Sequence, residues 1–152
     1  MSLPNSADLA LLKIQTAAGP PIVLTLLCGI RNVSINRSVT IGERQVRDCA
    51  APFAPPQRRI RNNGTTWSIS GSGEDNVDLY EIYDEAYGVK RQYSVELYKD
   101  NQTDELGDLM GTYSGTAMFS THNNTFDQTS DDAGTIDITL EGEGLLVWTP
   151  AA

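Results

Sequence analysis

The feature that most constrains the fold of this chain is the stretch at residues 135–144, which reads Thr-Ile-Asp-Ile-Thr-Leu-Glu-Gly-Glu-Gly. The apolar residues Ile136, Ile138 and Leu140 alternate with polar ones. A period of two is typical of a β-strand with one buried and one solvated face. The closing Gly-Glu-Gly sequence is expected to end the strand. The sequence therefore predicts a half-buried strand near the C-terminus.

A second stretch repeats this pattern. Residues 66–73 read Thr-Trp-Ser-Ile-Ser-Gly-Ser-Gly, in which Trp67 and Ile69 are apolar and the same Gly-x-Gly ending follows. Each stretch has a similar lead-in, at residues 29–36 and 115–122 respectively. We interpret the chain as two related hairpins, one with a short loop and one with a very long connection.

The remaining segments complete a β-rich chain. Residues 77–87 form a predicted helix, with an apolar stripe at i, i+3, i+4 spacing, a cap at Asp75 or Asn76 and a stop at Gly88. We expect one domain over residues 1–152. It is mainly β, an antiparallel β-sandwich or partly open barrel of about eight strands, with one flanking α-helix and a long extended arm. The predicted strands cover residues 8–14, 22–27, 30–36, 65–73, 91–98, 115–121, 135–141 and 145–148.

Composition excludes several classes of protein. The chain has 152 residues and 39% apolar residues, and no apolar run approaches the roughly 20 residues of a membrane span. We expect no membrane span and no secretory signal. The net charge of −9 disfavours tight binding to nucleic acid, because such binding requires many basic residues to neutralise the phosphates.

The charge is unevenly distributed. Residues 37–64 contain six arginines and two acids, a net charge of +4, whereas the rest of the chain has five basic and eighteen acidic residues, a net charge of −13. The segment has poor periodicity and three prolines, yet its apolar residues argue against a linker. We interpret it as an ordered arm that binds another subunit. Its candidate contact residues are Arg37, Arg44, Arg47, Cys49, Phe53, Arg58, Arg59 and Arg61.

Residues for catalysis are missing from the sequence. There is no histidine pair for zinc, no calcium loop, no Gly-rich phosphate loop and no nucleophile elbow. His122 is the single histidine, and we expect it on a solvated loop. A Cys–His dyad would lack supporting local context. We therefore expect no enzyme activity, no cofactor and no metal.

Cys28 and Cys49 fit neither a metal site nor a disulfide scaffold. One interpretation is two free thiols in a reducing compartment. The other is a disulfide between Cys49 of one subunit and Cys28 of a neighbour.

With their apolar residues inward, the four hairpin strands present a predicted polar face. It is small, hydroxylic and acidic, with Met118 as its sizeable apolar member and no lysine or arginine. Ordinary surfaces mix both charges, and long basic side chains grip phosphates. This face is either an unremarkable solvated sheet or a surface past which a polyanion slides without sticking. It comprises Asn32, Ser34, Asn36, Thr66, Ser68, Ser70, Ser72, Thr116, Ser120, Asp137, Thr139, Glu141 and Glu143.

In their order along the chain, these segments resemble the major tail tube proteins of long-tailed bacteriophages, which are related to the tubes of contractile-injection and secretion systems. The resemblance rests on residues 66–73 leading into a helix and on residues 135–144. The long connection after Asn36 and the hairpin from Gly115 fall in matching places. It covers roughly residues 30–146, and the two cysteines and the Pro- and Arg-rich arm depart from it.

The resemblance implies a structural subunit that forms hexameric rings stacked into a tube. Each subunit would give four strands to a continuous inner barrel, and the arm would reach an adjacent ring. Other tail proteins, such as a tape measure, sheath or terminator, would be partners. The expected location is the virion tail, after synthesis in the host bacterial cytoplasm. DNA would pass without specific binding through a lumen lined by Asn32, Ser34, Asn36, Ser68, Ser70, Ser72, Asp137, Thr139, Glu141 and Glu143.

Two other classes stay open at this point. A β-sandwich binding or adhesion module of a virion or cell surface would share the strands. It should show an aromatic or metal-lined pocket, for which Trp67 and Trp148 are too few. A nucleic-acid binder could use Arg58, Arg59 and Arg61, and its affinity would depend steeply on salt.

Overall fold

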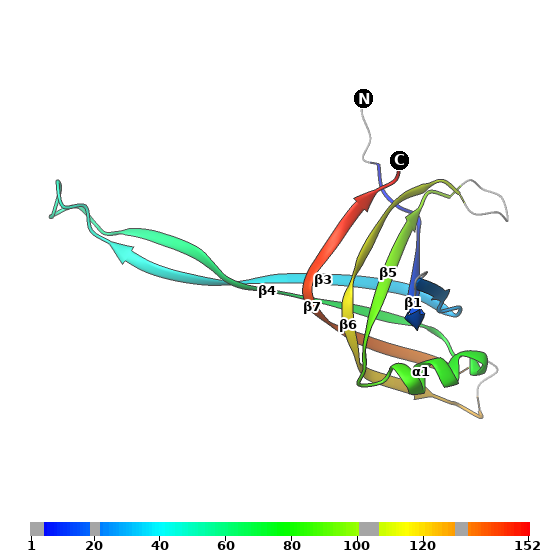
Figure 1. Cartoon of the computed structure of the whole chain (residues 1–152). Helices are drawn as coiled ribbons and strands as arrows, with labels where there is room; N and C mark the ends of the chain where they lie inside the picture. The colour runs from blue at the N-terminus through cyan, green and yellow to red at the C-terminus, as the bar shows by residue number, and fades with distance from the viewer. Residues whose placement is uncertain (1–4, 19–21, 101–106, 130–133) are drawn as a thin grey trace.

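The computed structural model describes residues 5–18, 22–100, 107–129 and 134–152. Within these residues, seven strands form one antiparallel sheet in the order β2-β1-β5-β6-β7-β4-β3 (Figure 1). The strands are β1 (Leu9–Ala18), β2 (Ile22–Leu26), β3 (Ile30–Val46), β4 (Gln57–Glu74), β5 (Lys90–Tyr98), β6 (Leu109–Thr125) and β7 (Thr135–Pro150).

The long strands β6 and β7 connect two layers of the body. The first part of β6, from Leu109 to Met118, pairs with β5. Next to β5 in the sheet lie β1 and then β2, and these strands form the first layer. The first part of β7, from Thr135 to Glu141, pairs with β4. Next to β4 in the sheet lies β3, and these strands form the second layer. The sheet therefore folds over on itself without closing, and β2 and β3 are its two open edges.

The core lies between these two layers. On β7, Ile136, Ile138 and Leu140 are at most 1% exposed, as their alternation predicts. Trp67 and Ile69 on β4 are buried as well. Each such side chain contributes roughly 1.5–3 kcal/mol on burial, so the contact between the layers is the main source of stability. The other strands add Leu12, Ile14, Tyr93, Val95, Ala117 and Phe119.

A short helical segment covers one end of the core. It consists of a 3-10 turn (Val77–Leu79) followed by helix α1 (Tyr80–Ala86), within the region where the sequence predicts a helix. The side chain of Asn76 caps its start by accepting a hydrogen bond from the backbone N–H of Asp78. The buried side chains of the predicted stripe are Leu79, Tyr83 and Ala86, whereas Ile82 is half-buried and Tyr87 is exposed.

The predicted fold class is confirmed, but the last two predicted strands are one. β7 continues to Pro150, so Gly142 and Gly144 do not end it. A Cβ atom at Gly142 would lie 2.0 Å from Cε2 of Trp67, so only glycine leaves room for the indole. The Trp67 Nε1–H also donates to the carbonyl oxygen of Gly144 at 3.2 Å. These glycines allow the strand to bend around a buried tryptophan.

The arm, residues 37–64, is also more regular than the sequence suggests. The sequence predicts a strand that ends at residue 36, but β3 and β4 stay paired from Ile30 opposite Gly73 to Val46 opposite Gln57. The arm is therefore a two-stranded hairpin that projects from the body (Figure 1). A shift in register between Thr40 and Ile41 hides its period from sequence analysis.

Candidate functional site: a polar sheet face and a projecting arm

The register brings the predicted polar residues into rows across neighbouring strands. Ser34 lies opposite Ser70, Ser70 opposite Thr139, and Thr139 opposite Thr121. Directly opposed residues point to the same side of a sheet, so each row lies on one face. A second row joins Asn32, Ser72, Asp137 and Asn123, and a third joins Asn36, Ser68, Glu141, Met118 and Lys90.

These three rows and Glu143 form the polar face of the body, on the side of the strands away from the core. Its acidic residues, Asp137, Glu141 and Glu143, all lie on β7. The ten residues that the resemblance assigns to a lumen therefore share one face. Of these, Asn32, Ser34, Asn36, Ser70, Asp137, Glu141 and Glu143 are exposed, and Ser68, Ser72 and Thr139 are half-buried.

A β-bulge at Ser120 changes which side of β6 faces the core. Phe119 pairs with Leu140, but the next pair is Thr121 with Thr139, so the alternation shifts by one residue. Thr121 consequently joins the polar face. His122 turns to the core side, where its ring lies 5.0 Å from that of Tyr83. The expectation of a solvated histidine on a loop is wrong, and the sequence contains no glycine at the bulge to reveal it.

The polar face is not free of basic residues, contrary to the sequence prediction. Lys90 of β5 pairs with Met118, and its Nζ lies 2.9 Å from the Glu143 carboxylate. At the other end of the strands, Arg31 pairs with Glu74. Lys90 and Glu74 lie just outside the predicted strands, whereas Arg31 lies within one, at a register shift between Ile30 and Asn32 that simple alternation does not predict. The remaining carboxylates on this face, Asp137 and Glu141, form no ion pair within the described residues.

The arm has two distinct faces. In the register of β3 and β4, Arg44 lies opposite Arg59 and Gly42 lies opposite Arg61. We call Arg44, Arg59 and Arg61 the basic face. The opposite side carries Val39, Ile41 and Ile60, exposed by 49%, 53% and 62%, which we call the apolar face. Arg58 also lies on that side and pairs with Glu43 at 2.6 Å.

The tip of the arm is held by its own hydrogen bonds. The Arg47 guanidinium donates to the carbonyl oxygen of Pro52 at 2.6 Å, and the Asp48 carboxylate accepts from the N–H of Ala50 at 2.9 Å. This turn presents Phe53 with its side chain fully exposed. Aromatic residues, including phenylalanine, are enriched at protein–protein interfaces.

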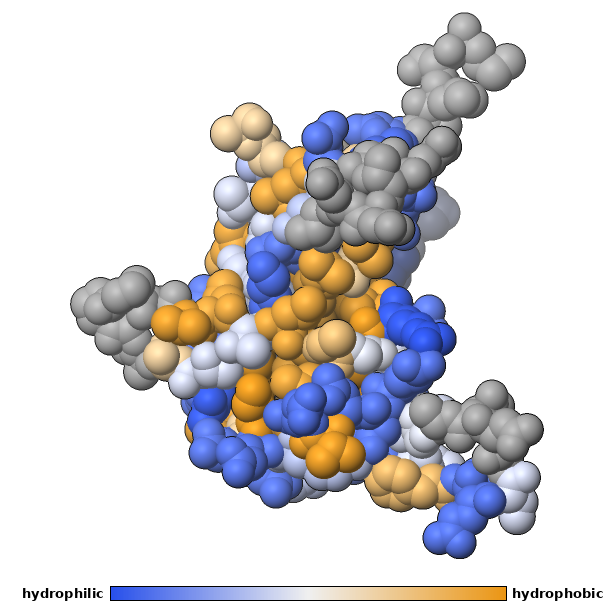
Figure 2. Space-filling view, turned by 90° about the vertical axis from the view of Figure 1, so that its right-hand side faces the viewer, coloured by the Kyte–Doolittle hydropathy of each residue, from blue (hydrophilic) through white to orange (hydrophobic). Residues whose placement is uncertain are grey.

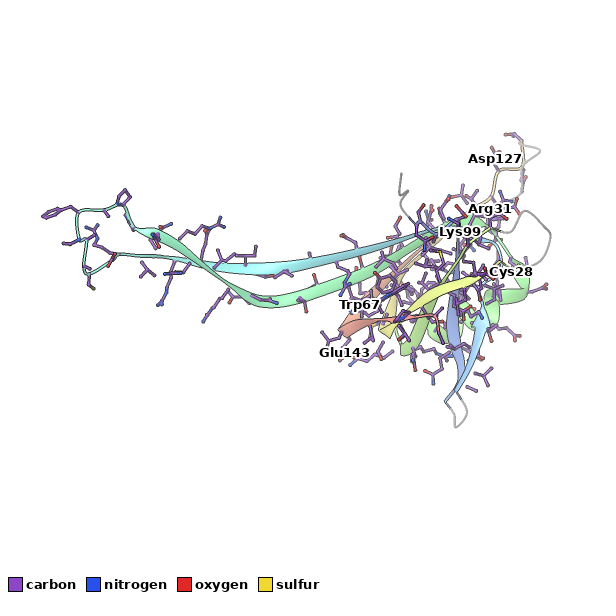
Figure 3. The ribbon with its side chains drawn as sticks, turned by 90° about the horizontal axis from the view of Figure 1, so that it is seen from above. Cys28, Arg31, Trp67, Lys99, Asp127 and Glu143 are labelled. Carbon is purple, nitrogen blue, oxygen red and sulfur yellow. The ribbon has the colours of Figure 1, made fainter. Side chains whose placement is uncertain are left out.

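The predicted arm residues do not act as one group. Arg37 lies at the root of the arm, 6.0 Å from the ring centroid of Tyr113 in the body. Cys49 lies at the tip, whereas Cys28 lies in the body on the side away from the arm (Figure 3). Both cysteines are exposed and free. A disulfide between them therefore requires two copies of the chain.

Among the described residues, the perturbed pKa values belong to tyrosines in or beside the core and to Tyr98 of β5, where a hydrogen bond to Glu96 raises the pKa to about 12. Burial raises the pKa of Tyr83 to about 12 and that of Tyr93 to about 12. The Tyr80 hydroxyl donates to Asp75, and this hydrogen bond raises the pKa of Tyr80. Tyr83 packs against Phe119 of β6, and the Tyr80 hydroxyl accepts from the Asn124 side chain of β6 at 3.5 Å, so these two residues connect the helical segment to the sheet. Tyr80, Tyr83 and Tyr93 lie neither on the polar face nor on the arm.

The described residues contain no group of three or more His, Cys, Asp or Glu side chains placed to hold a metal ion. Within the same residues, no helix is long and apolar enough to cross a membrane.

The side of the body opposite the arm shows apolar surface broken by polar patches (Figure 2). Exposed apolar side chains of β1 and β2 include Leu9, Val23, Leu24 and Leu26.

Chains from several known assemblies have the same fold. A chain from the tail of an empty gene transfer agent particle, of C6 symmetry, matches with a TM-score of 0.62 at 15% identity, over 97% of this chain and 99% of that chain. A chain from the extended sheath–tube complex of the PVC extracellular contractile injection system matches with a TM-score of 0.64 at 15% identity, over 97% and 93%. The SPP1 tail tube matches with a TM-score of 0.60 at 14% identity, over 97% and 80%.

No protein-family model matches the sequence, and no curated protein matches it either. At these low identities, the likeness to solved structures establishes the fold. This protein has the fold found in the SPP1 tail tube and in the assemblies named above.

Proposed function

We propose that this protein is the structural subunit of a bacteriophage tail tube. Six copies form a ring, and rings stack into a tube in the virion tail through which DNA passes into the host. The fold shared with the SPP1 tail tube supports this proposal, and so does the C6 symmetry of the similar gene transfer agent tail. Other tail proteins, such as a sheath, terminator or tape measure, are the further partners.

The observation that carries the proposal is a pair of open strand edges on either side of the polar face. β3 pairs only with β4 among the described strands. On the other side, pairing of β6 with β5 ends at Met118. From Ser120 to Thr125, β6 pairs with β7 along one edge, and none of the described strands lies along its other edge. Long unpaired edges are templates for another chain.

The strand directions permit these edges to join copy to copy. β3, β4, β7 and β6 alternate in direction, because each neighbouring pair is antiparallel. The β3 of a second copy can therefore pair with β6 of the first in antiparallel fashion, and so on around a ring. Six copies contribute about 24 strands, more than the 16–18 strands that already leave an aqueous channel in a closed barrel.

The polar face would line this channel, because the opposite face is covered by the core and the outer layer. Hydroxyl groups and carboxylates offer no cationic group to hold a phosphate. The carboxylates of Asp137 and Glu141 repel DNA over about 8 Å at physiological salt. Lys90 beside Glu143 forms a neutral pair rather than a free cation. DNA would accordingly pass without specific binding.

The arm would connect successive rings. Its exposed apolar residues and Phe53 bury nothing within the subunit, whereas a neighbouring copy could cover them. A disulfide from Cys49 of one copy to Cys28 of another belongs to this arrangement. Because every copy carries both cysteines, it would appear on non-reducing gels as a ladder of multiples of the monomer mass that a reductant converts to monomer, and a purely monomeric band would exclude it.

Negative-stain microscopy of the purified protein tests the proposal, with long hollow tubes as the expected result. A variant in which Asn-Gly replaces residues 41–63 closes a short hairpin between Thr40 and Gly64. It should stay folded and no longer form tubes. Discrete particles of the unmodified protein would contradict the proposal, and full tubes from the shortened variant would contradict the role of the arm.

The lumen has its own test. Asp137→Lys with Glu141→Lys should leave tubes intact, since both side chains are exposed, but should slow or stall DNA ejection by the assembled phage. The matched control is Asp137→Asn with Glu141→Gln, which removes negative charge without adding positive charge. Ejection at the normal rate by the lysine variant would rule out a role for lumen charge.

A further inference from the structure

The arm and helix α1 lie at opposite ends of one strand. β4 leads from the arm through the body to Glu74, and the helical segment begins at Val77. Figure 1 shows the arm and α1 on opposite sides of the body. At about 3.3 Å per residue, the strand from Arg61 to Glu74 spans roughly 43 Å. The arm of one copy therefore cannot reach its own α1.

The basic face of the arm is electrostatically unsatisfied. Arg44 lies directly opposite Arg59, and like charges in that position destabilise an antiparallel pair. No carboxylate pairs with Arg44, Arg59 or Arg61 among the described residues. The arm's Glu43 pairs instead with Arg58 on the other face. Arg61 donates to the side-chain oxygen of Asn63 at 2.9 Å, but this face has no anionic partner within the residues that the structure describes.

The exposed side of the helical segment is negatively charged, and its acidic residues also lack ion-pair partners among the described residues. Asp78, Glu81, Asp84 and Glu85 are all exposed, and α1 has no basic residue in its last turn. Glu81 and Glu85 form a like-charge i, i+4 pair, which destabilises a helix. Asp84 and Glu85 lie near the C-terminal end, where the helix dipole disfavours negative charge. These acids form no ion pair in the part of the chain that the structure describes.

We propose that the basic face of the arm of one copy binds the acidic side of α1 on a second copy. This inference rests on the proposed function and names the surface that receives the arm. A copy displaced along the direction of β4 places its α1 beside the arm of the first. Repeating the same displacement gives an open stack, as head-to-tail contacts do. Each contact removes like-charge repulsion from both surfaces.

The dimensions and the cysteine positions fit this contact. Arg59 and Arg61 are two strand residues apart, about 6.6 Å, and Glu81 and Glu85 are four helix residues apart, about 6 Å. The carbonyl oxygen of Cys28 accepts a hydrogen bond from the side chain of Asn76 at 3.2 Å, so Cys28 lies at the start of the acidic segment. Cys49 follows Arg44 toward the tip of the arm. The docked arm would bring the two cysteines to the same region.

A charge exchange tests the contact. The arm-reversed variant carries Arg44→Glu, Arg59→Glu and Arg61→Glu, and the helix-reversed variant carries Glu81→Lys, Asp84→Lys and Glu85→Lys. Each alone should raise the concentration needed for polymerisation about a hundredfold or more, because like charges then meet at the contact. A chain with all six changes should polymerise again. An equimolar mixture of the two variants should also polymerise, since each arm then finds an opposite charge on the other variant.

The control is Lys13→Gln with Glu96→Gln, which neutralises an ion pair between β1 and β5 that lies outside the arm and outside α1, and should leave polymerisation within about twofold of the unmodified protein. Circular dichroism checks that each variant is folded. If the arm-reversed variant fails to polymerise while the helix-reversed variant still polymerises, the arm binds elsewhere and the inference is wrong. Lack of rescue in both the six-fold variant and the mixture would overturn it as well.

These results separate the inference from the proposed function. Tubes of the unmodified protein without charge rescue would refute the contact alone. Association of the two reversed variants in sedimentation velocity, without any tubes, would support the contact and refute the tube. Neither tubes nor association would refute both.

Discussion

The strands β3 and β4 have the same pairing in two opposite environments. Within the body, Trp67 and Ile69 of β4 are 5% and 1% exposed. Farther along the same hairpin, Ile41 and Ile60 are 53% and 62% exposed. A two-stranded hairpin by itself is at best marginally stable in water. The body is therefore stabilised by its own core, whereas the exposed apolar residues of the arm contribute little to the stability of a single copy and are available to a partner.

The largest effect is expected in the body. Phe119→Ala removes a ring that is fully buried between the layers, and should lower the free energy of unfolding by about 3–5 kcal/mol. Urea denaturation followed by circular dichroism measures this loss. An unchanged midpoint would mean that the core is not where the structure places it.

Alkaline unfolding should likewise depend on the body. The folded pKa values of Tyr83 and Tyr93 are each raised by burial to about 12. Their stabilising contribution is complete below the ordinary tyrosine pKa of about 10, and is lost as the pH rises through the folded value. We expect a loss of roughly 2–3 kcal/mol per tyrosine between about pH 10 and 12.

Urea denaturation at several alkaline pH values tests this expectation. Tyr83→Phe should flatten the pH dependence, and Tyr87→Phe, at a position that is 55% exposed, is the matched control. Equal slopes for both variants would show that ionisation of Tyr83 is not linked to unfolding.

A smaller effect is expected at the helix cap. Asn76→Ala removes the side chain that accepts from the Asp78 N–H and donates to the Cys28 carbonyl. The loss should be about 1 kcal/mol. Thermal unfolding compared with Asn76→Asp, which keeps the accepting oxygen but not the donor, separates the two hydrogen bonds. No loss in either variant would contradict the cap.

The smallest effect on stability is expected at the arm tip. Phe53→Ala changes the same side chain as Phe119→Ala, but at a position that is fully exposed. The free energy of unfolding should change by less than about 0.5 kcal/mol, as for ordinary surface substitutions. The concentration needed for polymerisation should rise. A large loss of monomer stability would show that the arm folds back onto the body.

Local patterns in the sequence were sufficient to predict which residues form the core of the fold. The alternation of Ile136, Ile138 and Leu140 determined which side of β7 is buried, because successive side chains of a strand point to opposite faces. The same logic placed the ten polar residues on one face. The apolar stripe predicted the position of the helical segment, and the concentration of arginines in residues 37–64 distinguished the arm from the rest of the chain.

Other features were decided by tertiary structure. Gly142 does not end its strand because Trp67, far away in sequence, packs against it. His122 faces the core because the partner strand permits a bulge at Ser120, and Lys90 joins the polar face because β5 pairs with β6. Continuous pairing of the arm depends on the cross-strand register beyond Thr40. Each of these depends on which residue lies opposite which across strands, and the order of residues along one strand does not contain that information.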